Sequence, residues 1–324
     1  MRAVLCPAFG APLEMADLPS PPLGAHQVRI RVAAAGVNFA DTLFIAGKYQ
    51  EKVEPPLIPG MELAGTVIEV GADVTTLATG DRVMAAVTGG AFADEAVAEE
   101  TDAIRLPDSL DFVTAAGFPV AYGTSHLGLK WKANLRAGEV LVVHGAAGGV
   151  GLTAVEVGRA LGATVIATAG GADKVQVALD HGAHHGIDYK AEDIRTRVKE
   201  LTGGRGADVV YDPVGGEVFD ASLRSIAPDG RILVIGFASG NVPQIPANHL
   251  LVKNVTVIGY WWGTYRKLNP ALVRDSLAEC VAWWADGKLR PHVSRTLPLE
   301  QAADALALLK SRGATGKVVL TPSP

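Results

Sequence analysis

The sequence predicts an α/β protein, with a doubly wound parallel sheet in the middle of the chain and a mostly antiparallel, barrel-like β domain before it. Between residues 139 and 260, short β-branched runs alternate with longer segments of helical character. Most of these runs are apolar at successive positions, as expected of strands that are covered on both faces. The 324 residues exceed the usual size of one hydrophobic core, so we expect two domains.

The predicted elements follow in order along the chain. The early β runs are QVRIRVAAAGV (27–37), LAGTVIEVG (63–71), GDRVMAAV (80–87) and AFADEAVA (91–98). The six central strands are EVLVVHG (139–145), ATVIATA (163–169), HGIDY (185–189), ADVVYDPVG (207–215), GRILVIGF (230–237) and NVTVIGY (254–260). The tail predicts helices over 270–289 and 301–310, an extended run over 295–300 and a final strand over 316–321. We assign 122–260 to the parallel-sheet domain, and 1–121 with 261–324 to the other.

Composition excludes several classes of function. The net charge is −5 and no Lys/Arg run is present, which argues against binding to nucleic acid or anionic lipid. Two cysteines are too few for a disulfide framework and fit a reducing compartment. The N-terminal residues lack a signal-peptide pattern, and no apolar run of about 18 residues follows. We therefore expect a cytoplasmic protein without a membrane or nucleic-acid partner.

The segment HGAAGGVG, which follows the first central strand, predicts a dinucleotide site. Gly148 and Gly151 occupy the second and third glycine positions of a GxGxxG pattern, and Ala146 replaces the first. Residues Gly148, Gly149, Val150 and Gly151 are therefore candidate pyrophosphate contacts, because a helix N-terminus offers unpaired amides and positive potential. A purely structural turn is the alternative, and the surrounding strand–helix units favour binding.

The end of the second central strand favours NADPH over NADH. An NAD-binding fold usually carries Asp or Glu about twenty residues after the glycines, where Ala169 and Gly170 stand here. Lys174 follows on the first turn of the next helix and can pair with a 2′-phosphate. As the alternative, Lys174 is a solvated helix residue, and the adjacent Asp173 weakens the local positive potential.

Six motifs occur in one order along nearly the whole chain: GVNFADTLFIAGKY, PLIPGMELAGTVIEVG, GDRV, HGAAGGVG, ADVVYDPVGG and ATGKVVL. In this combination the sequence resembles the zinc-free quinone oxidoreductases of the medium-chain dehydrogenase/reductase superfamily, the zeta-crystallin-like group. The resemblance implies a GroES-like β-barrel catalytic domain, built from both ends of the chain around a Rossmann domain, with the active site between them. It also implies a homodimer formed through the Rossmann edge strand.

Three positions argue against zinc. Zinc-dependent relatives carry Cys where this chain has Asn38, His where it has Met61, and a third ligand near Val120. Cys6 is the only cysteine before residue 280, so the four-cysteine lobe of a structural zinc site is missing as well. We interpret the cluster His181, His184 and His185 as an exposed connection rather than a metal site.

The resemblance implies roles for individual residues of the catalytic domain. Asn38 would contact the nicotinamide ribose region, and Asp41 would orient it or a bound water; helix capping is the alternative for both. Tyr49 would contact the substrate and is the candidate proton donor, or it packs as a rim aromatic. Leu43 and Val120 replace more polar residues of some relatives, which predicts a more apolar pocket.

The remaining carried-over positions concern the cofactor. Gly170, Lys174 and Tyr189 would surround the 2′-phosphate, and Gly236 with Phe237 would support the nicotinamide side. Arg312 would reach across from the tail. The alternatives are a half-buried strand tyrosine for Tyr189 and a solvated charge for Arg312. The aromatic group Tyr260, Trp261, Trp262 and Tyr265 lines the substrate cleft, buries a hinge or forms a subunit contact.

The expected function is NADPH-dependent hydride transfer to a quinone or another α,β-unsaturated carbonyl, without metal or flavin. Alcohol oxidation requires stabilisation of an alkoxide, and no Lewis acid is expected here for that role, whereas a conjugated acceptor delocalises the negative charge itself. Two alternatives stay open. One is a related reductase acting on enoyl thioesters or alkenals, and the other is a non-catalytic NADPH-binding protein with a structural or RNA-binding role.

Overall fold

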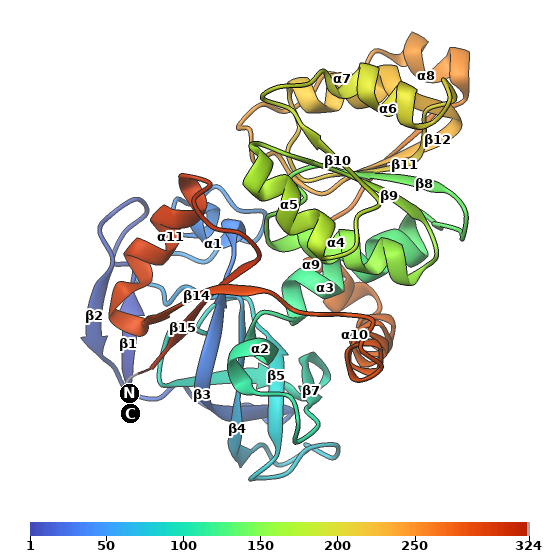
Figure 1. Cartoon of the computed structure of the whole chain (residues 1–324). Coiled ribbons are helices and arrows are strands. Elements are labelled where there is room, and N and C mark those ends of the chain that lie inside the picture. The colour runs from blue at the N-terminus through green and yellow to red at the C-terminus, as the bar shows by residue number, and fades with distance from the viewer. Residues whose placement is uncertain (323–324) are drawn as a thin grey trace. The chain divides into compact units, whose positions relative to one another are not determined.

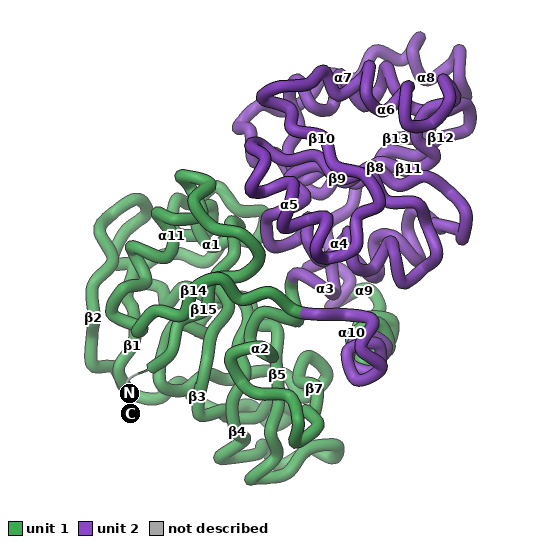
Figure 2. The backbone as a smooth tube through the Cα atoms, viewed as in Figure 1, with its two compact units in different colours: residues 1–120, 268–278, 291–324 green, residues 121–267, 279–290 purple. Residues whose placement is uncertain are grey.

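The computed structural model describes residues 1–322, which divide into two compact units (Figures 1 and 2). Unit 1, green in Figure 2, comprises residues 1–120, 268–278 and 291–324. Unit 2, purple, comprises residues 121–267 and 279–290. Residues 261–267 and 279–290, which sequence analysis assigns to the catalytic domain, thus lie in unit 2.

Unit 2 contains one six-stranded parallel sheet, which confirms the predicted doubly wound architecture. In spatial order the strands are β10 (His185–Asp188), β9 (Thr164–Ala169), β8 (Val140–Val143), β11 (Ala207–Asp212), β12 (Ile226–Val234) and β13 (Thr256–Gly259). Chain order therefore reverses at β8, as in dinucleotide-binding sheets. Each predicted central run overlaps one of these strands, and five of the six contain theirs. The exception is 230–237, because β12 already begins at Ile226.

Helices cover both faces of this sheet. Successive side chains of a strand point to opposite sides, so each strand contributes residues to a core on either face. Val142 of β8 packs in one core with Phe219 and Val198, while the neighbouring Leu141 lies against Gly158, where a Cβ would approach its side chain to 2.4 Å. The helices are α3 (Pro119–His126), α4 (Gly149–Ala160), α5 (Ala172–Asp180), α6 (Ile194–Leu201), α7 (Glu217–Ser225), α8 (Ala247–Lys253) and α9 (Trp262–Leu268). A π-helical segment, Leu127–Lys132, continues from α3.

Unit 1 contains a seven-stranded sheet that the C-terminal tail completes. The strands are β14 (Val293–Pro298), β15 (Lys317–Thr321), β3 (Gln27–Val37), β4 (Glu62–Val70), β5 (Arg82–Ala86) and β7 (Ala103–Arg105), with β6 (Glu95–Glu99) paired to β3. All pairs are antiparallel except β14–β15. The predicted run 91–98 becomes a strand only from Glu95, since the backbone near Phe92 bonds to Val4 instead.

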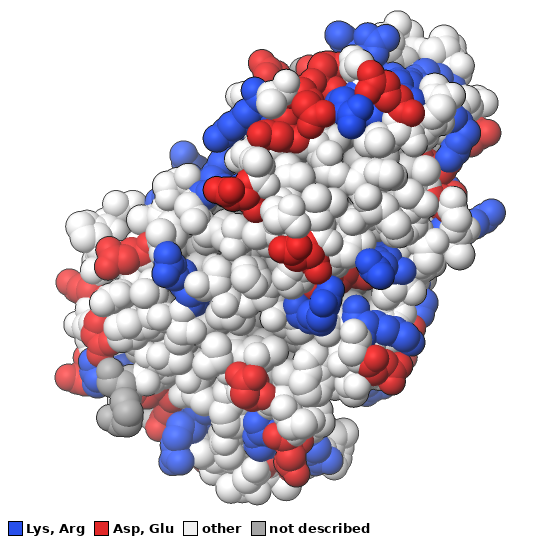
Figure 3. All heavy atoms as spheres, viewed as in Figure 1, with Lys and Arg blue, Asp and Glu red and all other residues white. Residues whose placement is uncertain are grey.

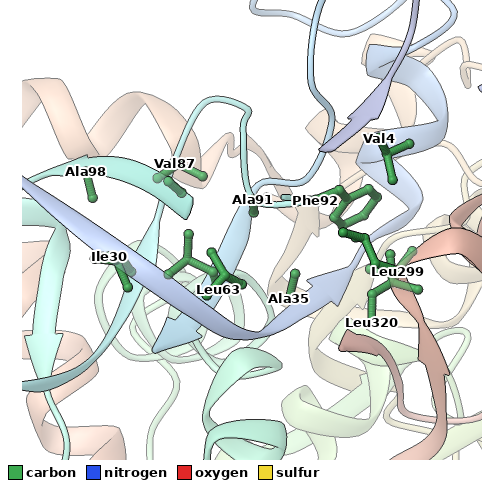
Figure 4. Packing of buried hydrophobic residues seen from close by; sticks show 14 of the residues in the cluster. Val4, Ile30, Ala35, Leu63, Val87, Ala91, Phe92, Ala98, Leu299 and Leu320 are labelled. Atoms are coloured by element: carbon green, nitrogen blue, oxygen red, sulfur yellow. The ribbon is translucent and has the colours of Figure 1, made fainter. Parts of the chain in front are cut away.

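The core of unit 1 lies between this sheet and the shorter elements that cover it. A separate pair is formed by β1 (Arg2–Leu5) and β2 (Glu14–Asp17). The helices are α1 (Phe39–Phe44), α2 (Phe112–Ala116), α11 (Ala302–Lys310) and α10 (Pro270–Ala285), the last of which is divided between the units. Short 3-10 turns span Glu100–Asp102 and Leu299–Gln301. In Figure 4 the Phe92 ring lies next to Val4 and Leu299, so both ends of the chain share one core.

The surface over α6 and α7 carries charges of both signs (Figure 3). A pocket there is lined by Asp193, Arg195, Thr196, Lys199, Glu200, Glu217, Asp220, Ala221 and Arg224. Because acidic and basic groups alternate, this pocket presents no single-sign potential. Within residues 1–322, no helix is both long and apolar enough to cross a membrane.

Candidate functional site

The carboxyl ends of parallel strands lie along one edge of a sheet, and in unit 2 this edge carries the predicted dinucleotide residues. Gly148 follows β8, Gly170 follows β9 and Gly236 follows β12. Ligands of doubly wound sheets bind at this edge, at the point where strand order reverses. The structure therefore places the three predicted glycine positions at the edge where such folds bind nucleotides.

The turn between β8 and α4 shows that the two motif glycines serve different purposes. A Cβ at Gly151 would lie 2.2 Å from Gly145 O and 2.9 Å from Ala146 Cα, so only glycine allows α4 to pack here. A Cβ at Gly148 would meet only Gly145 O, at 3.4 Å, and otherwise enters open space. Gly148 is the N-cap of α4 and offers no side-chain acceptor to the first-turn amides. Those amides are unpaired within the helix and suit a phosphate beside Gly148.

His144, the first residue of the glycine motif, is a structural residue that sequence analysis did not assign. Its buried ring bonds through Nδ1 to Thr168 Oγ1 at 2.8 Å and through Nε2 to Ser222 Oγ at 2.6 Å. Ser222 Oγ itself donates to Val218 O, so it accepts from His144 Nε2–H. Burial lowers the pKa of His144, which keeps the ring neutral. His144 thus joins β8, β9 and α7 beneath the glycine turn.

The ends of β9 and β10 bring together the residues predicted for the 2′-phosphate. A Cβ at Gly170 would lie 2.5 Å from the Tyr189 hydroxyl, and Tyr189 N donates to Ala169 O. Asp188, at the end of β10, is an acid close to this position, and its Oδ1 accepts from Gly171 N at 2.8 Å and Lys190 N at 3.0 Å. Lys174 lies on the first turn of α5. The Asp188 carboxylate is therefore committed to the backbone.

Phe237 lies beside the glycine loop that follows β11. A Cβ at Gly215 would lie 3.1 Å from the Phe237 ring, and a Cβ at Gly236 would be 3.6 Å from Pro213 O. Asp212 Oδ1 accepts from the backbone amides of Val214 and Gly215 at 2.8 and 2.9 Å, which fixes this loop. The predicted residues after β12 therefore border a loop with a rigid backbone.

In unit 1, Asn38 and Asp41 lie together at the start of α1, as the N-cap and the third residue of the helix. Asp41 Oδ2 accepts from Asn38 N at 2.7 Å, so Asp41 caps the helix from its third position. Asp41 N donates to the backbone oxygen of Asn38 at 3.1 Å and also faces the Asn38 side chain, so the two residues form a capping box. Helix capping therefore describes both residues, and the Asn38 side chain has further partners.

The side chain of Asn38 is held by two buried charged residues that sequence analysis missed. Its Nδ2 donates to Glu62 Oε1 at 2.8 Å, and its Oδ1 accepts from Lys317 Nζ at 2.7 Å. Lys317 also pairs with Glu62 Oε1 at 2.6 Å, and Glu62 Oε2 accepts from Val120 N at 2.8 Å. The signal was a charged residue at the start of each of two strands, β4 and β15, directly followed by apolar residues.

Asp41 is fully buried, and its second carboxylate oxygen has no hydrogen-bond partner among the described residues. Burial raises the pKa of Asp41 to about 7 from an ordinary value of 3.8. The bond from Asn38 N and the charge of Lys317 oppose this rise, and the charge of Glu62 adds to it. Asp41 is therefore mostly protonated below about pH 7, and it lies next to the buried polar group formed by Asn38, Glu62 and Lys317.

The pKa of Asp41 predicts a pH dependence of stability. Between pH 3.8 and about 7 folded Asp41 holds a proton that the unfolded chain releases, so the free energy of unfolding falls as pH rises, by about 4 kcal/mol overall. We expect Asp41→Asn to flatten this slope in urea unfolding between pH 4 and 8. The control is Asp108→Asn, which makes the same change at a fully exposed position. Equal slopes for the wild type and both variants would contradict the prediction.

Two of the three residues at the positions of zinc ligands in relatives, Met61 and Val120, have apolar surroundings. Met61 belongs to a buried cluster with Cys6, Phe44 and Leu57, and Val120 packs against that cluster. Tyr49 packs there too, with its ring edge-on to Phe44 at 6.4 Å between centroids. Within residues 1–322, no three His, Cys, Asp or Glu side chains are arranged to hold a metal ion.

The histidine triplet is less exposed than the sequence suggested. His181 Nδ1 lies 2.5 Å from Glu156 Oε1 and is half-buried, because it caps α5 against the buried face of α4. His184 Nδ1 accepts from Val165 N at 3.0 Å, and His185 is exposed. The three rings therefore have separate environments. His184 and His185 are exposed, as expected for a surface connection. For His181 that expectation is wrong.

The aromatic residues after β13 pack within unit 2, and Arg312 lies on the surface of unit 1. A Cβ at Gly123 would lie 2.8 Å from the Trp262 indole, and one at Gly128 would lie 3.0 Å from the Tyr260 ring. Tyr260 and Trp262 thus require glycines in α3 and the π-helical segment. Arg312 is exposed, with a left-handed φ of 56°, on the turn after α11.

Two family models match different parts of the chain. Residues 24–108 match the family described as alcohol dehydrogenase GroES-like domain, which confirms the predicted barrel type, and residues 149–278 match the family described as zinc-binding dehydrogenase. A quinone oxidoreductase-like protein 2 homolog from Nematostella vectensis is 44% identical over 323 residues, 98% of this chain and 88% of that protein.

Solved structures agree with these matches. A quinone oxidoreductase from Pseudomonas syringae pv. Tomato DC3000 has a TM-score of 0.93 and 34% identity, covering 99% of both chains. The Escherichia coli quinone oxidoreductase, determined in complex with NADPH, has a TM-score of 0.93 and 30% identity, covering 99% of this chain and 100% of that one. The chain therefore belongs to the quinone oxidoreductase group of the medium-chain dehydrogenase/reductase superfamily and is an oxidoreductase.

Proposed function

We propose that this protein oxidises NADPH and delivers the hydride to a quinone or another α,β-unsaturated carbonyl. The observation that carries the proposal is the end of β9, where Gly170 and Gly171 stand in place of an acid. The space at Gly171 is open, with no atom within 4 Å of an added Cβ, and the Asp188 carboxylate is bound to backbone amides. Lys174 supplies the cation, and the Tyr189 hydroxyl borders Gly170. The Escherichia coli relative was determined with NADPH, which supports the same cofactor here.

The chain's own residues would bind and orient the reactants. The first-turn amides of α4 hold the pyrophosphate beside Gly148, and Gly236 with Phe237 supports the nicotinamide side. When NADPH is bound, its dihydronicotinamide supplies the hydride. Asn38 donates a hydrogen bond near the nicotinamide ribose, and Tyr49 contacts the acceptor from a half-buried position. Arg312, on the turn after α11, is a further candidate cofactor contact.

We further propose that no zinc takes part. The amide atoms of Asn38 are engaged by Glu62 and Lys317, while Met61 and Val120 lie in an apolar cluster. This donor set does not fit a zinc ion, which prefers Cys, His and carboxylate ligands. The acceptor must then stabilise the charge that follows hydride transfer, as conjugated carbonyls do. That requirement favours quinones and enones over simple alcohols or ketones.

Turnover measurements test the reaction directly. NADPH oxidation is followed with 1,4-naphthoquinone, a short enoyl-CoA and an alkenal as acceptors. Fastest turnover with naphthoquinone supports the proposal, whereas preference for enoyl-CoA or the alkenal supports the related reductase. Tight NADPH binding without reduction of any acceptor would point to a non-catalytic protein and overturn the proposal.

Charge reversal at Lys174 tests the choice of cofactor. Lys174→Glu places a carboxylate where the 2′-phosphate is proposed, so we expect NADPH affinity to fall at least tenfold, about 1.4 kcal/mol or more, while NADH affinity stays constant or rises. Calorimetric titration with both cofactors measures this. The control is Lys190→Glu, an exposed lysine close by in sequence. Equal losses for NADPH and NADH would show that Lys174 does not read the phosphate.

We also propose a homodimer through the edge of the unit 2 sheet, and cytoplasmic location. The edge strand β13 pairs only with β12, and next to it along the chain α8 exposes Leu251 and Val252 to 78% and 75%. An uncovered strand edge beside apolar side chains favours pairing with a second copy. Cys6 and Cys280 are both buried free thiols, which fits a reducing compartment. Sedimentation velocity that shows only monomers would contradict the dimer.

A further inference from the structure

The buried cluster around Lys317 allows its hydrogen bonds to be counted completely. The ammonium has three N–H donors, and they go to Val37 O at 2.9 Å, Asn38 Oδ1 at 2.7 Å and Glu62 Oε1 at 2.6 Å. Glu62 is fully buried, and its two oxygens accept from Asn38, Lys317 and Val120. Lys317 has no donor left over, so its orientation is fixed by the protein alone.

This saturation determines which way the Asn38 amide points. An ammonium group only donates, so the atom that faces Lys317 must be the carbonyl oxygen of the amide. A carboxylate only accepts, so the atom that faces Glu62 must be the amide nitrogen. Rotating the amide by half a turn would place N–H against the ammonium and oxygen against the carboxylate, two repulsive contacts in a buried site. One orientation of Asn38 is therefore strongly favoured.

The amide nitrogen of Asn38 has a second N–H. The first is bonded to Glu62 Oε1, and the residue retains 8% of its surface exposed. The carbonyl oxygen is already directed at Lys317. The N–H that Glu62 does not bind is therefore the donor that the Asn38 amide has available for a ligand.

We propose that Glu62 and Lys317 are positioning residues that hold Asn38 as a hydrogen-bond donor to an oxygen atom of the bound reactants. The acceptor is either a ribose hydroxyl oxygen of the nicotinamide half or the carbonyl oxygen of the substrate. This inference rests on the proposed function, because it requires those ligands to bind at Asn38. Glu62 and Lys317, which are not among the predicted site residues, would thereby determine that the Asn38 amide presents an N–H group to the ligand.

If Glu62 and Lys317 had only a structural role, a different result would be expected. A double variant distinguishes that role from the positioning role. In Lys317→Met the Glu62 carboxylate is left buried without its cation, so stability falls. Adding Glu62→Gln removes that charge, and the introduced amide can accept from Val120 N through its oxygen and donate to Asn38 through its nitrogen. Asn38 must then turn its own oxygen toward the new glutamine. The double variant therefore regains stability while the ligand meets an acceptor instead of a donor.

The experiment combines side-chain amide NMR of ¹⁵N-labelled full-length protein with binding and kinetics. Asn38→Asp identifies the Asn38 amide signals by their loss. In the wild type we expect one amide proton to be protected by Glu62 and the other to shift when ligand is added. A shift on adding NADPH alone assigns the acceptor to the cofactor. A shift only when 1,4-naphthoquinone is added with unreactive NADP⁺ assigns it to the substrate.

For the single variant Lys317→Met we expect lower thermal stability and at least a tenfold rise in the NADPH dissociation constant or the naphthoquinone KM, according to which ligand shifts the signal. For the double variant we expect recovered thermal stability with the tenfold loss retained. Arg29→Met is the control, because it removes one charge from a partly exposed pair between β3 and β4, Arg29–Glu69, and Arg29 lies near the start of β3 whereas Asn38 follows its end. Its Asn38 signals and its ligand binding should match the wild type.

Two results would overturn the inference. One is recovery of both stability and ligand affinity in the double variant, which would make the pair structural only. The other is an Asn38 amide whose protons move with neither ligand. Failure of the proposed function can be distinguished from failure of this inference. If the wild type reduces no acceptor but its Asn38 amide proton shifts with NADPH, the proposed reaction is wrong and the inference stands.

Discussion

Gly148→Ala is expected to fold as stably as the wild type and to lose at least tenfold in NADPH affinity. The added Cβ meets only Gly145 O, at 3.4 Å, an ordinary contact, and the φ of −84° at this position suits an L-residue. The methyl group instead enters the space where the pyrophosphate approaches the backbone. Thermal unfolding measures the first expectation, and fluorescence titration with NADPH measures the second.

Gly151→Ala, three residues later, is the matched comparison with the opposite outcome. Its Cβ would lie 2.2 Å from Gly145 O, and because the obstacle is backbone, α4 must shift away from the turn. We expect the free energy of unfolding to drop by about 3 kcal/mol, as in severe overpacking. If Gly148→Ala were the less stable variant, or bound NADPH like the wild type, the division of tasks between the two glycines would be wrong.

Glu156→Leu is expected to be the most destabilising single change in unit 2. Glu156 is 3% exposed and accepts from Tyr122 Oη at 2.5 Å, His181 Nδ1 at 2.5 Å and Arg290 N at 3.1 Å. Leucine keeps much of the volume but leaves these donors buried without an acceptor. A loss of about 3–5 kcal/mol follows, measured by urea unfolding.

The control for Glu156 is a glutamate that is paired on the surface. Glu200 bonds to Arg197 within α6 and its side chain is 54% exposed, so Glu200→Leu should change the free energy of unfolding by less than about 1 kcal/mol. If Glu156→Leu lost as little free energy of unfolding as Glu200→Leu, the prediction would be wrong, because water would then satisfy the three donors in place of the carboxylate. Glu156→Gln should lie between the two, since one of its terminal atoms still accepts.

The parallel sheet of unit 2 could be predicted closely because its strands carry their own signal. Runs such as VLVV at 140–143 are apolar on both faces, and glycine or aspartate ends most of them. The division of the tail could not be predicted in this way. Residues 279–290 belong to unit 2 through contacts of single side chains, such as Lys130 with Glu279 and Glu156 with the amide of Arg290. A helical periodicity does not reveal such partners.

The candidate site was predictable to the extent that local motifs define it. The separate tasks of Gly148 and Gly151 follow from the strand–turn–helix context, and Asn38 with Asp41 from their spacing of three residues. Glu62 and Lys317 are separated by 255 positions, so their pairing depends on how β4, β3 and β15 are ordered in the sheet. A buried charge in each strand indicated that a partner exists, but only the fold identifies it.

The pairing of β15 with β3 also constrains the order in which the protein can assemble during its synthesis. β3 ends at Val37, yet its neighbour β15 ends at Thr321, whereas the last segment of unit 2 ends at Arg290. On the ribosome, the whole of unit 2 therefore emerges before the sheet of unit 1 can close. Until then, β4 and β6 can pair with β3, but the backbone of Ala35–Val37 has no strand on the side that β15 will occupy, which is when a chaperone would have most to protect.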